Sequence, residues 1–182
     1  MILPPEFYDR DTVTVAKDLL GCLLVHQDET GTTMGWIVED EAYLQGDPAA
    51  HSYRGETKRN RAMFGPPGHA YVYRIYGLHT CFNVVTGPEG IGEAVLIRAL
   101  EPAVGIDLMQ ARRGTDDPLA LASGPGKLTQ ALKITMDLDG TSLIDGPLQV
   151  WSPESLPGRR PEGIDGEIVQ TTRIGITKAA DL

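Results

Sequence analysis

The sequence predicts an α+β fold: a single domain, residues 1–182, in which helices pack around one curved, mostly antiparallel sheet. Three observations favour this class. The length of 182 residues and the apolar content of 41% suit one globular domain. Segments of strand character follow one another across short glycine-containing turns, which favours antiparallel pairing. Segments of helical character fall near the start and between about residues 104 and 134 instead of alternating with the strands.

The first half of the chain is expected to hold one helix and several hairpins. Asp11 can cap a helix over 12–20, and Gly21 would end it. A polar loop is expected over 45–62, because glycine, proline and charged residues replace the apolar pattern there. The expected strands cover 22–25, 34–43, 70–76, 81–86 and 94–100.

The second half is expected to carry the other helices and two late strands. One helix is expected at about 104–113, and Asp116-Asp117-Pro118 suits the first turn of a short helix. The segment from Ser123 to Lys127 would open a third helix. That helix is expected over 128–134, and the late strands over 143–151 and 168–176.

Composition excludes several classes of protein. Cys22 and Cys81 lie far apart in apolar settings, so we expect two reduced core thiols and neither a disulfide framework nor a metal site. No segment approaches the roughly 20 apolar residues of a membrane span, and the N-terminus has no basic region. We therefore expect a cytoplasmic protein with no membrane partner.

The charge distribution is more informative than the net charge of −9. Residues 51–113 carry 8 basic and 5 acidic residues, whereas the stretches before and after them are net negative. A local basic patch is what a DNA-binding surface requires, although charge also fluctuates along any chain. Lys58, Arg59 and Arg61 form the densest basic run and are candidates for phosphate contacts.

Glu41 and Arg98 are the candidate acid/base pair. In an alternating strand Glu39 and Glu41 share one face, while Asp40 and Ala42 occupy the other. Carboxylates at a strand end are commonly a solvated edge. However, Arg98 lies within an apolar strand, where an arginine is costly unless it is paired. A paired Glu41 would stay ionised and could activate water.

Aromatic residues offer a place for a nucleobase. Tyr43 and Tyr73 could sandwich a base, and Tyr76, beside Gly77 near a hairpin tip, is a candidate wedge between base pairs. The alternative is that the tyrosines belong to the core. His51 in the polar loop is more commonly a surface residue than a ligand. Ser123–Lys127 could bind a phosphate at a helix start, although it lacks P-loop spacing.

In series, these residues resemble the alkyladenine (3-methyladenine) DNA glycosylases. The resemblance covers nearly the whole chain, and motifs at family spacing are specific. The matching segments are Val38–Leu44, Ala49–Ser52, Arg59–Arg61 with Met63-Phe64, Pro67-Gly68, Tyr71–Tyr73, Ile75–Gly77, Cys81, Asn83, Leu96–Pro102 with Arg98, and Ser123–Leu128.

The resemblance implies a cofactor-free, monofunctional glycosylase, acting as a monomer on damaged double-stranded DNA. Such an enzyme flips alkylated or deaminated purines out of the duplex and hydrolyses the N-glycosidic bond, leaving an abasic site. By similarity, Glu41 activates the water, Arg98 positions Glu41 and Tyr76 intercalates. The residues implied to form the base pocket are Tyr43, Ala49, His51, Tyr73 and Asn83, with Asn83 discouraging guanine. The residues implied to contact the DNA backbone are Lys58, Arg59, Arg61, Ser123 and Lys127.

The chain also departs from the family pattern. The loop before His51 is one residue shorter than in animal members, and Arg74 replaces an apolar residue. Both changes lie near the expected pocket and therefore bear on substrate range. The chain stops at Leu182, where relatives commonly continue with an aromatic-basic tail.

Two other functions stay open from the sequence. A non-catalytic nucleic-acid-binding module, such as the tRNA-binding domain of a formyltransferase, would use the basic run without needing Glu41 paired with Arg98. A purely structural role would use the tyrosines as core, and the solvent accessibility of Tyr76 would decide that case. Neither the order of preference among 3-methyladenine, hypoxanthine, ethenoadenine and methylguanine nor the oligomeric state follows from the sequence.

Overall fold

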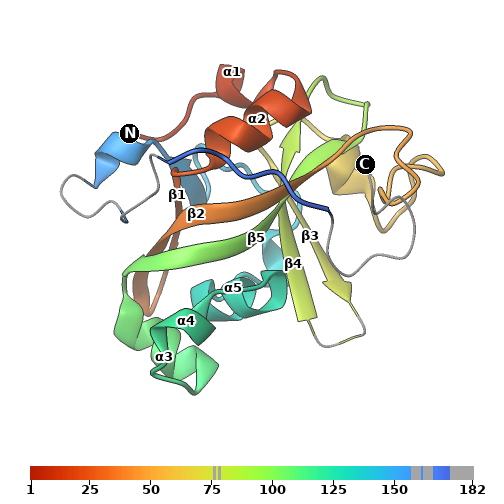
Figure 1. Ribbon diagram of the computed structural model, residues 1–182. Coiled ribbons are helices and arrows are strands. Elements are labelled where there is room, and N and C mark those ends of the chain that lie inside the picture. The colour runs from red at the N-terminus through yellow and green to blue at the C-terminus, as the bar shows by residue number, and fades with distance from the viewer. Residues whose placement is uncertain (76, 78, 157–160, 162–165, 173–182) are drawn as a thin grey trace.

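A computed structural model describes residues 1–75, 77, 79–156, 161 and 166–172. Its centre is one curved six-stranded sheet in the order β3-β4-β5-β2-β1-β6, in which all neighbouring strands are antiparallel (Figure 1). The strands are β1(Leu23–Asp28), β2(Gly31–Tyr43), β3(Ala70–Ile75), β4(His79–Thr86), β5(Glu93–Val104) and β6(Leu148–Trp151). The predicted α+β class with a mostly antiparallel sheet is confirmed.

The helices are short, and all of the described ones except α3, which follows Gly105, begin where the sequence supplies a capping side chain or a proline. Asp11 accepts a hydrogen bond from the backbone N–H of Thr14, as expected for the N-cap of α2. Asp117 and Pro118 open α4 in the predicted way. The helices are α1(Pro5–Tyr8), α2(Thr12–Leu19), α3(Ile106–Arg113), α4(Pro118–Leu121) and α5(Pro125–Leu132), with 3₁₀ turns η1(Arg61–Phe64), η2(Met136–Leu138) and η3(Pro153–Ser155).

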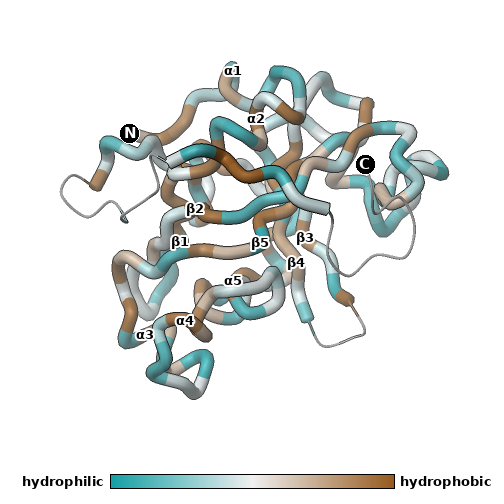
Figure 2. Tube along the Cα trace, viewed as in Figure 1, coloured by the Kyte–Doolittle hydropathy of each residue, from teal (hydrophilic) through white to brown (hydrophobic). Residues whose placement is uncertain are grey.

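The sheet buries apolar side chains on both faces. The larger core lies between the sheet and the helices α2 and α5, and it contains Val15, Val95, Ile97 and Leu128. A smaller cluster on the opposite face joins Tyr71, Val85 and Ala94 to Met63 of η1. Hydropathy along the chain follows this arrangement, with apolar stretches where the central strands meet the helices (Figure 2). Cys22 and Cys81 are buried free thiols, as predicted.

Two β-bulges, one on β2 and one on β5, determine which side chains of these strands point to which face of the sheet. Ile37 lies opposite Leu100, Glu39 opposite Ala99, and Asp40 opposite Ile97, so Val38 and Arg98 have no residue opposite them. Such bulges redirect the side chains that follow. Ile37 therefore faces the larger core, yet Glu41 does not, although strict alternation from Ile37 would place both on the same face.

The two predicted late strands need correction. The late strand begins at Leu148 and not at 143, because Asp145, Gly146 and Pro147 form a turn that interrupts it. No strand forms over 168–172, and 173–176 lie outside the described residues. The proposed strand failed because Ile168 and Val169 are exposed instead of buried on a sheet. The short helix α1 was not anticipated.

A buried charge cluster ties the β1–β2 turn to α3 and to the end of α5. The Asp28 carboxylate lies 3.1 Å from both Arg112 Nη2 and Lys133 Nζ, and it also accepts hydrogen bonds from Thr30. Burial opposes ionisation of Asp28, but the Thr30 hydrogen bonds together with Lys133 and Arg112 outweigh it and hold the pKa of Asp28 well below its usual range.

Asp28→Asn should lower the free energy of unfolding by about 2 kcal/mol near pH 7, because it weakens charge-assisted hydrogen bonds in a buried setting. Since the pKa of Asp28 is depressed in the folded state, its stabilisation is complete above the unfolded value of roughly 3.9 and fades at lower pH. Urea denaturation should therefore show a difference from the wild type that shrinks below about pH 4. Asp116→Asn, at an exposed aspartate, is the control; an equal loss of stability in both variants would contradict the assignment.

Candidate active site

The candidate site is built on one row of residues that crosses four strands. Glu41 of β2 lies opposite Leu96 of β5, Leu96 lies opposite Asn83 of β4, and Asn83 lies opposite Tyr71 of β3. Residues directly opposite in an antiparallel ladder point to the same face. The sheet therefore brings side chains from residues 41, 71, 83 and 96 onto the face away from the larger core.

Glu41 and Arg98 form the predicted ion pair. Arg98 Nη1 donates to Glu41 Oε2 at 2.7 Å, and the Glu41 side chain is only 8% exposed. Arg98 Nε also donates to Glu39 Oε1 at 2.9 Å, so one guanidinium contacts two carboxylates. Tyr43 donates its hydroxyl to Glu41 Oε1 at 2.9 Å. Both oxygens of Glu41 are thereby held in place.

The predicted aromatic residues cluster beside this pair. The rings of His51 and Tyr73 meet edge to face with centroids 4.5 Å apart, and those of Tyr71 and Tyr73 lie 5.3 Å apart. His51 Nδ1 lies 2.8 Å from the Tyr71 hydroxyl. Asn83 is buried and donates to the backbone oxygen of Tyr71. Tyr71 is itself a core residue, so the structural interpretation of the tyrosines holds for that one.

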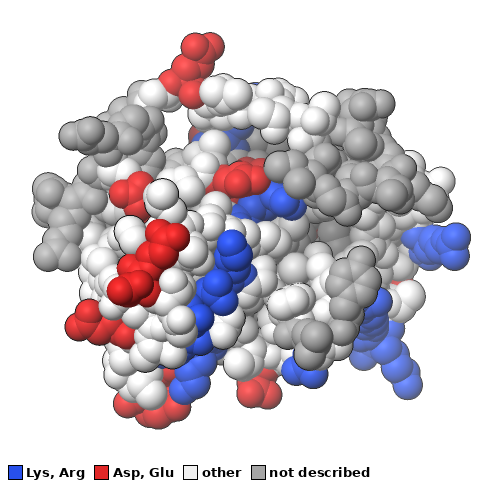
Figure 3. All heavy atoms as spheres, turned by 60° about the horizontal axis from the view of Figure 1, so that its bottom comes forward, with Lys and Arg blue, Asp and Glu red and all other residues white. Residues whose placement is uncertain are grey.

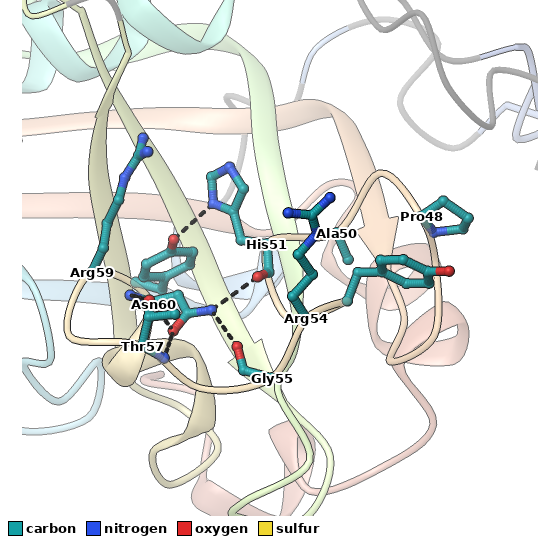
Figure 4. Close-up of a pocket in the computed structure, with 10 residues that line it drawn as sticks. Pro48, Ala50, His51, Arg54, Gly55, Thr57, Arg59 and Asn60 are labelled. Atoms are coloured by element: carbon teal, nitrogen blue, oxygen red, sulfur yellow. Dashed lines mark hydrogen bonds between the residues drawn. The ribbon is translucent and has the colours of Figure 1, made fainter.

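Asn60 organises the loop that carries His51. Its amide donates to the backbone oxygens of His51 and Gly55 and accepts from Thr57 (Figure 4). These hydrogen bonds satisfy a polar side chain on a residue that is only 2% exposed. Ala49 is fixed by a hydrogen bond from its backbone N–H to Asp47. The loop encloses a cavity of about 280 Å³. Its lining residues are Pro48, Ala50, His51, Tyr53, Arg54, Gly55, Thr57, Arg59, Asn60 and Tyr71.

A larger cavity of about 580 Å³ borders the acid itself. Glu39, Glu41 and Arg98 line it together with α2 and with residues 168–172, which run alongside β2 (Figure 1). Burial raises the pKa of Asp40, which also lines this cavity, to about 8, and the charge of Glu39 adds to the effect. Tyr43 and Tyr73 line neither of these two cavities.

The predicted backbone-binding residues are exposed. Arg61 pairs with Glu56, and Arg59 donates to the backbone oxygen of Arg74. Ser123 donates its hydroxyl to the backbone oxygen of Leu119. On one face of the molecule basic side chains extend through the middle and right, while acidic ones gather on the left (Figure 3). The residues predicted to contact the DNA backbone, all of them exposed, are Lys58, Arg59, Arg61, Ser123 and Lys127.

Tyr76 lies outside the described residues, so the wedge role remains a prediction. In the described part of the chain, no group of histidine, cysteine and acidic side chains is arranged to hold a metal ion. The helices described there are also too short and too polar to span a membrane.

Sequence reasoning missed three residues that shape the site. Glu39 was recognised as sharing a face with Glu41, but its contact with Arg98 was not anticipated. Asn60 and Tyr71 lie in segments that resemble the family, but no role at the site was expected for either residue. The contacts of Asn60 lie within its own loop. The spacing of Thr57 and Asn60, three residues apart, could therefore have indicated a local side-chain-to-backbone hydrogen bond in this loop.

Comparison with known proteins agrees with this geometry. The family described as methylpurine-DNA glycosylase (MPG) matches residues 6–182. A protein of Methanoculleus marisnigri named "Putative 3-methyladenine DNA glycosylase" is 79% identical over 182 residues, covering 100% of this chain and 92% of its own. Proteins of the same name from Carboxydothermus hydrogenoformans and Rhodopseudomonas palustris are 54% and 52% identical, covering 100% and 99% of this chain and 92% and 81% of their own.

The charge of Arg59 near His51 yields a test based on titration. Partial burial lowers the pKa of His51, and the nearby charge of Arg59 lowers it further. Arg59→Gln should therefore raise the pKa of His51 towards its ordinary value of about 6.5, as measured by NMR titration of the histidine rings. Lys58→Gln removes the same charge from the adjacent residue and should leave His51 unchanged. Equal shifts in the two variants would show that Arg59 has no specific effect.

Proposed function

This chain belongs to the methylpurine-DNA glycosylase family, and we infer on that basis that it is a DNA glycosylase that removes alkylated purines of the 3-methyladenine type. The observation that carries the proposal is the buried Glu41, whose two oxygens are held by Arg98 and Tyr43. A carboxylate held in this way is suited to activating water beside a sugar. The names of the relatives support the same substrate class.

The proposed reaction is hydrolysis by one water molecule. The water oxygen forms a bond to the anomeric carbon while the N-glycosidic bond breaks, and the bonding electron pair leaves with the ring nitrogen of the base. In an alkylated purine this electron pair cancels the positive charge of the base, so the departing base needs little help from an acid. Glu41 accepts the proton of the water and stabilises positive charge on the sugar. Arg98 orients the carboxylate and supplies its counter-charge.

Access to the bond requires the nucleotide to leave the duplex. Extrusion costs a few kcal/mol, which stacking on aromatic rings can offset. The cluster of His51 and Tyr73 beside Tyr43 supports a role for these rings as walls of the base pocket, with Ala49 at its edge. In the same proposal Asn83 disfavours the exocyclic amino group of guanine, and Tyr76 fills the space left in the duplex.

The basic surface would hold the DNA backbone. Lys58, Arg59 and Arg61 follow the loop that carries His51, so phosphates bound there would lie near the base pocket. Ser123 and Lys127 lie beside the start of α5 and would add a second contact. Since water is the nucleophile, no covalent enzyme–DNA adduct forms, and we propose a monofunctional enzyme that acts as a monomer and needs no cofactor.

A non-catalytic nucleic-acid-binding module would account for the basic surface alone. It would not require a nearly buried carboxylate held by an arginine on the neighbouring strand, which is costly to desolvate. The pair between Glu41 and Arg98 therefore favours the enzyme.

Glu41→Gln should slow release of 3-methyladenine from a duplex by at least about 10²-fold, because the amide cannot accept a proton from water. Single-turnover assays with excess enzyme would measure the rate. Glu101→Gln, at an exposed glutamate of β5, should retain the wild-type rate. The mechanism would be rejected by undiminished release from the Glu41 variant, and the proposed function by no release from the wild type.

Tyr76→Ala should impair excision from duplex DNA more than excision from a single strand, because a wedge assists only where base pairs must be opened. The comparison uses the same lesion in both substrates under single-turnover conditions. Equal losses on both substrates would show that Tyr76 contributes to the chemistry or to the pocket instead of to flipping.

A further inference from the structure

Arg98 divides one positive charge between two carboxylates. Its Nη1 contacts Glu41 and its Nε contacts Glu39, at 2.7 Å and 2.9 Å. The Arg98 side chain is 16% exposed and that of Glu39 is 49% exposed, so the second carboxylate lies at the solvent side of the cluster. The hydrolysis proposed above needs only the pair formed by Glu41 and Arg98, which leaves the contact with Glu39 without a role.

The consequence of that contact is a local excess of negative charge. Two carboxylates and one guanidinium carry a formal charge of −1. Tyr43 contributes a neutral hydroxyl, and the high pKa of Asp40 keeps its carboxyl protonated near neutrality. The other charged residues lining the same cavity are Lys17 and Asp47, which cancel formally. Glu39 therefore converts a neutral ion pair into an anionic cluster around the catalytic carboxylate.

We propose that Glu39 is a specificity-determining residue that makes this enzyme favour purines carrying a positive charge, such as N3- and N7-alkylated purines, over neutral lesions such as hypoxanthine. The inference rests on the proposed function and adds a substrate class to it. An alkylated purine nucleotide carries the extra positive charge when it enters the pocket, and during bond cleavage that charge moves from the base to the sugar without leaving the site. A neutral lesion brings no such charge, so an anionic cluster stabilises the cationic substrate more.

Geometry supports an electrostatic role for Glu39. An amide at this position would still offer an oxygen to Arg98 Nε, so the hydrogen bond can survive while the charge is lost. Glu39→Gln thus separates charge from positioning. If Glu39 acted only by holding Arg98 in place, any substitution that disturbed it would slow the excision of cationic and neutral bases by the same factor.

The test compares excision of 7-methylguanine with excision of hypoxanthine at one position of the same duplex. Enzyme is in excess of DNA but below saturation, so that each single-turnover rate includes binding of the substrate. We expect Glu39→Gln to lower the ratio of the two excision rates by about tenfold, the scale of one unit charge at close range in a partly screened site. Glu39→Asp keeps the charge and should keep the wild-type ratio even if both rates fall. The matched control is Asp18→Asn, because Asp18 also pairs with an arginine at 2.9 Å and is 49% exposed.

Each outcome of this experiment is decisive. An unchanged ratio in Glu39→Gln, or an equal loss of the ratio in Glu39→Asp, would overturn the proposal. Raising the salt from about 0.05 M to about 0.5 M should lower the ratio for the wild-type enzyme, because the charge of a half-exposed carboxylate is screened; a constant ratio would also overturn it. If the wild type released neither base, the proposed function itself would fail, whereas release of both with an unaffected ratio would reject only the role of Glu39.

Discussion

The register of β2 against β5 is the constraint on which the rest of the structure depends. A side chain on a strand faces one side or the other, so a shift of one residue exchanges core for surface. The unpaired residues Val38 and Arg98 introduce that shift on both strands at once. Ile37 can then belong to the larger core while Glu41, four residues later, lies on the opposite face. Without the two bulges, the Glu41 carboxylate would point into an apolar interior.

Because the Glu41 side chain has little contact with solvent, its negative charge needs a cation as a partner. A nearly buried carboxylate without a partner would lose solvation and take up a proton, which would remove its value as a base. Arg98 lies at the second bulge, so the irregularity that turns Glu41 away from the core also places its counter-ion across the ladder. The same two positions thus satisfy both strand geometry and electrostatics. Tyr43 also donates to the Glu41 carboxylate, whereas Glu39 accepts a hydrogen bond from the Arg98 guanidinium.

The parts of this arrangement that depend on local pattern could be predicted from the sequence. The cap at Asp11, the hairpins and the shared face of Glu39 and Glu41 follow from short-range rules, and Arg98 was identified because an arginine in an apolar strand needs a partner. The cavities could not be predicted, because they depend on how residues distant in sequence pack together. The strand predicted over 168–176 was wrong in its described part, 168–172, for a related reason. An apolar run shows strand propensity but does not reveal whether a neighbouring strand is available for pairing.

Beyond Ile37, β2 has a strand partner only on its β5 side within the described residues, since β1 reaches no further than Trp36 in the ladder. Its other edge borders the cavity that residues 168–172 help to enclose. A bare strand edge is a template for pairing with a second molecule. A chain shortened before residue 168 would therefore leave this edge of the strand that carries Glu41 open to intermolecular β-pairing, and self-association would follow.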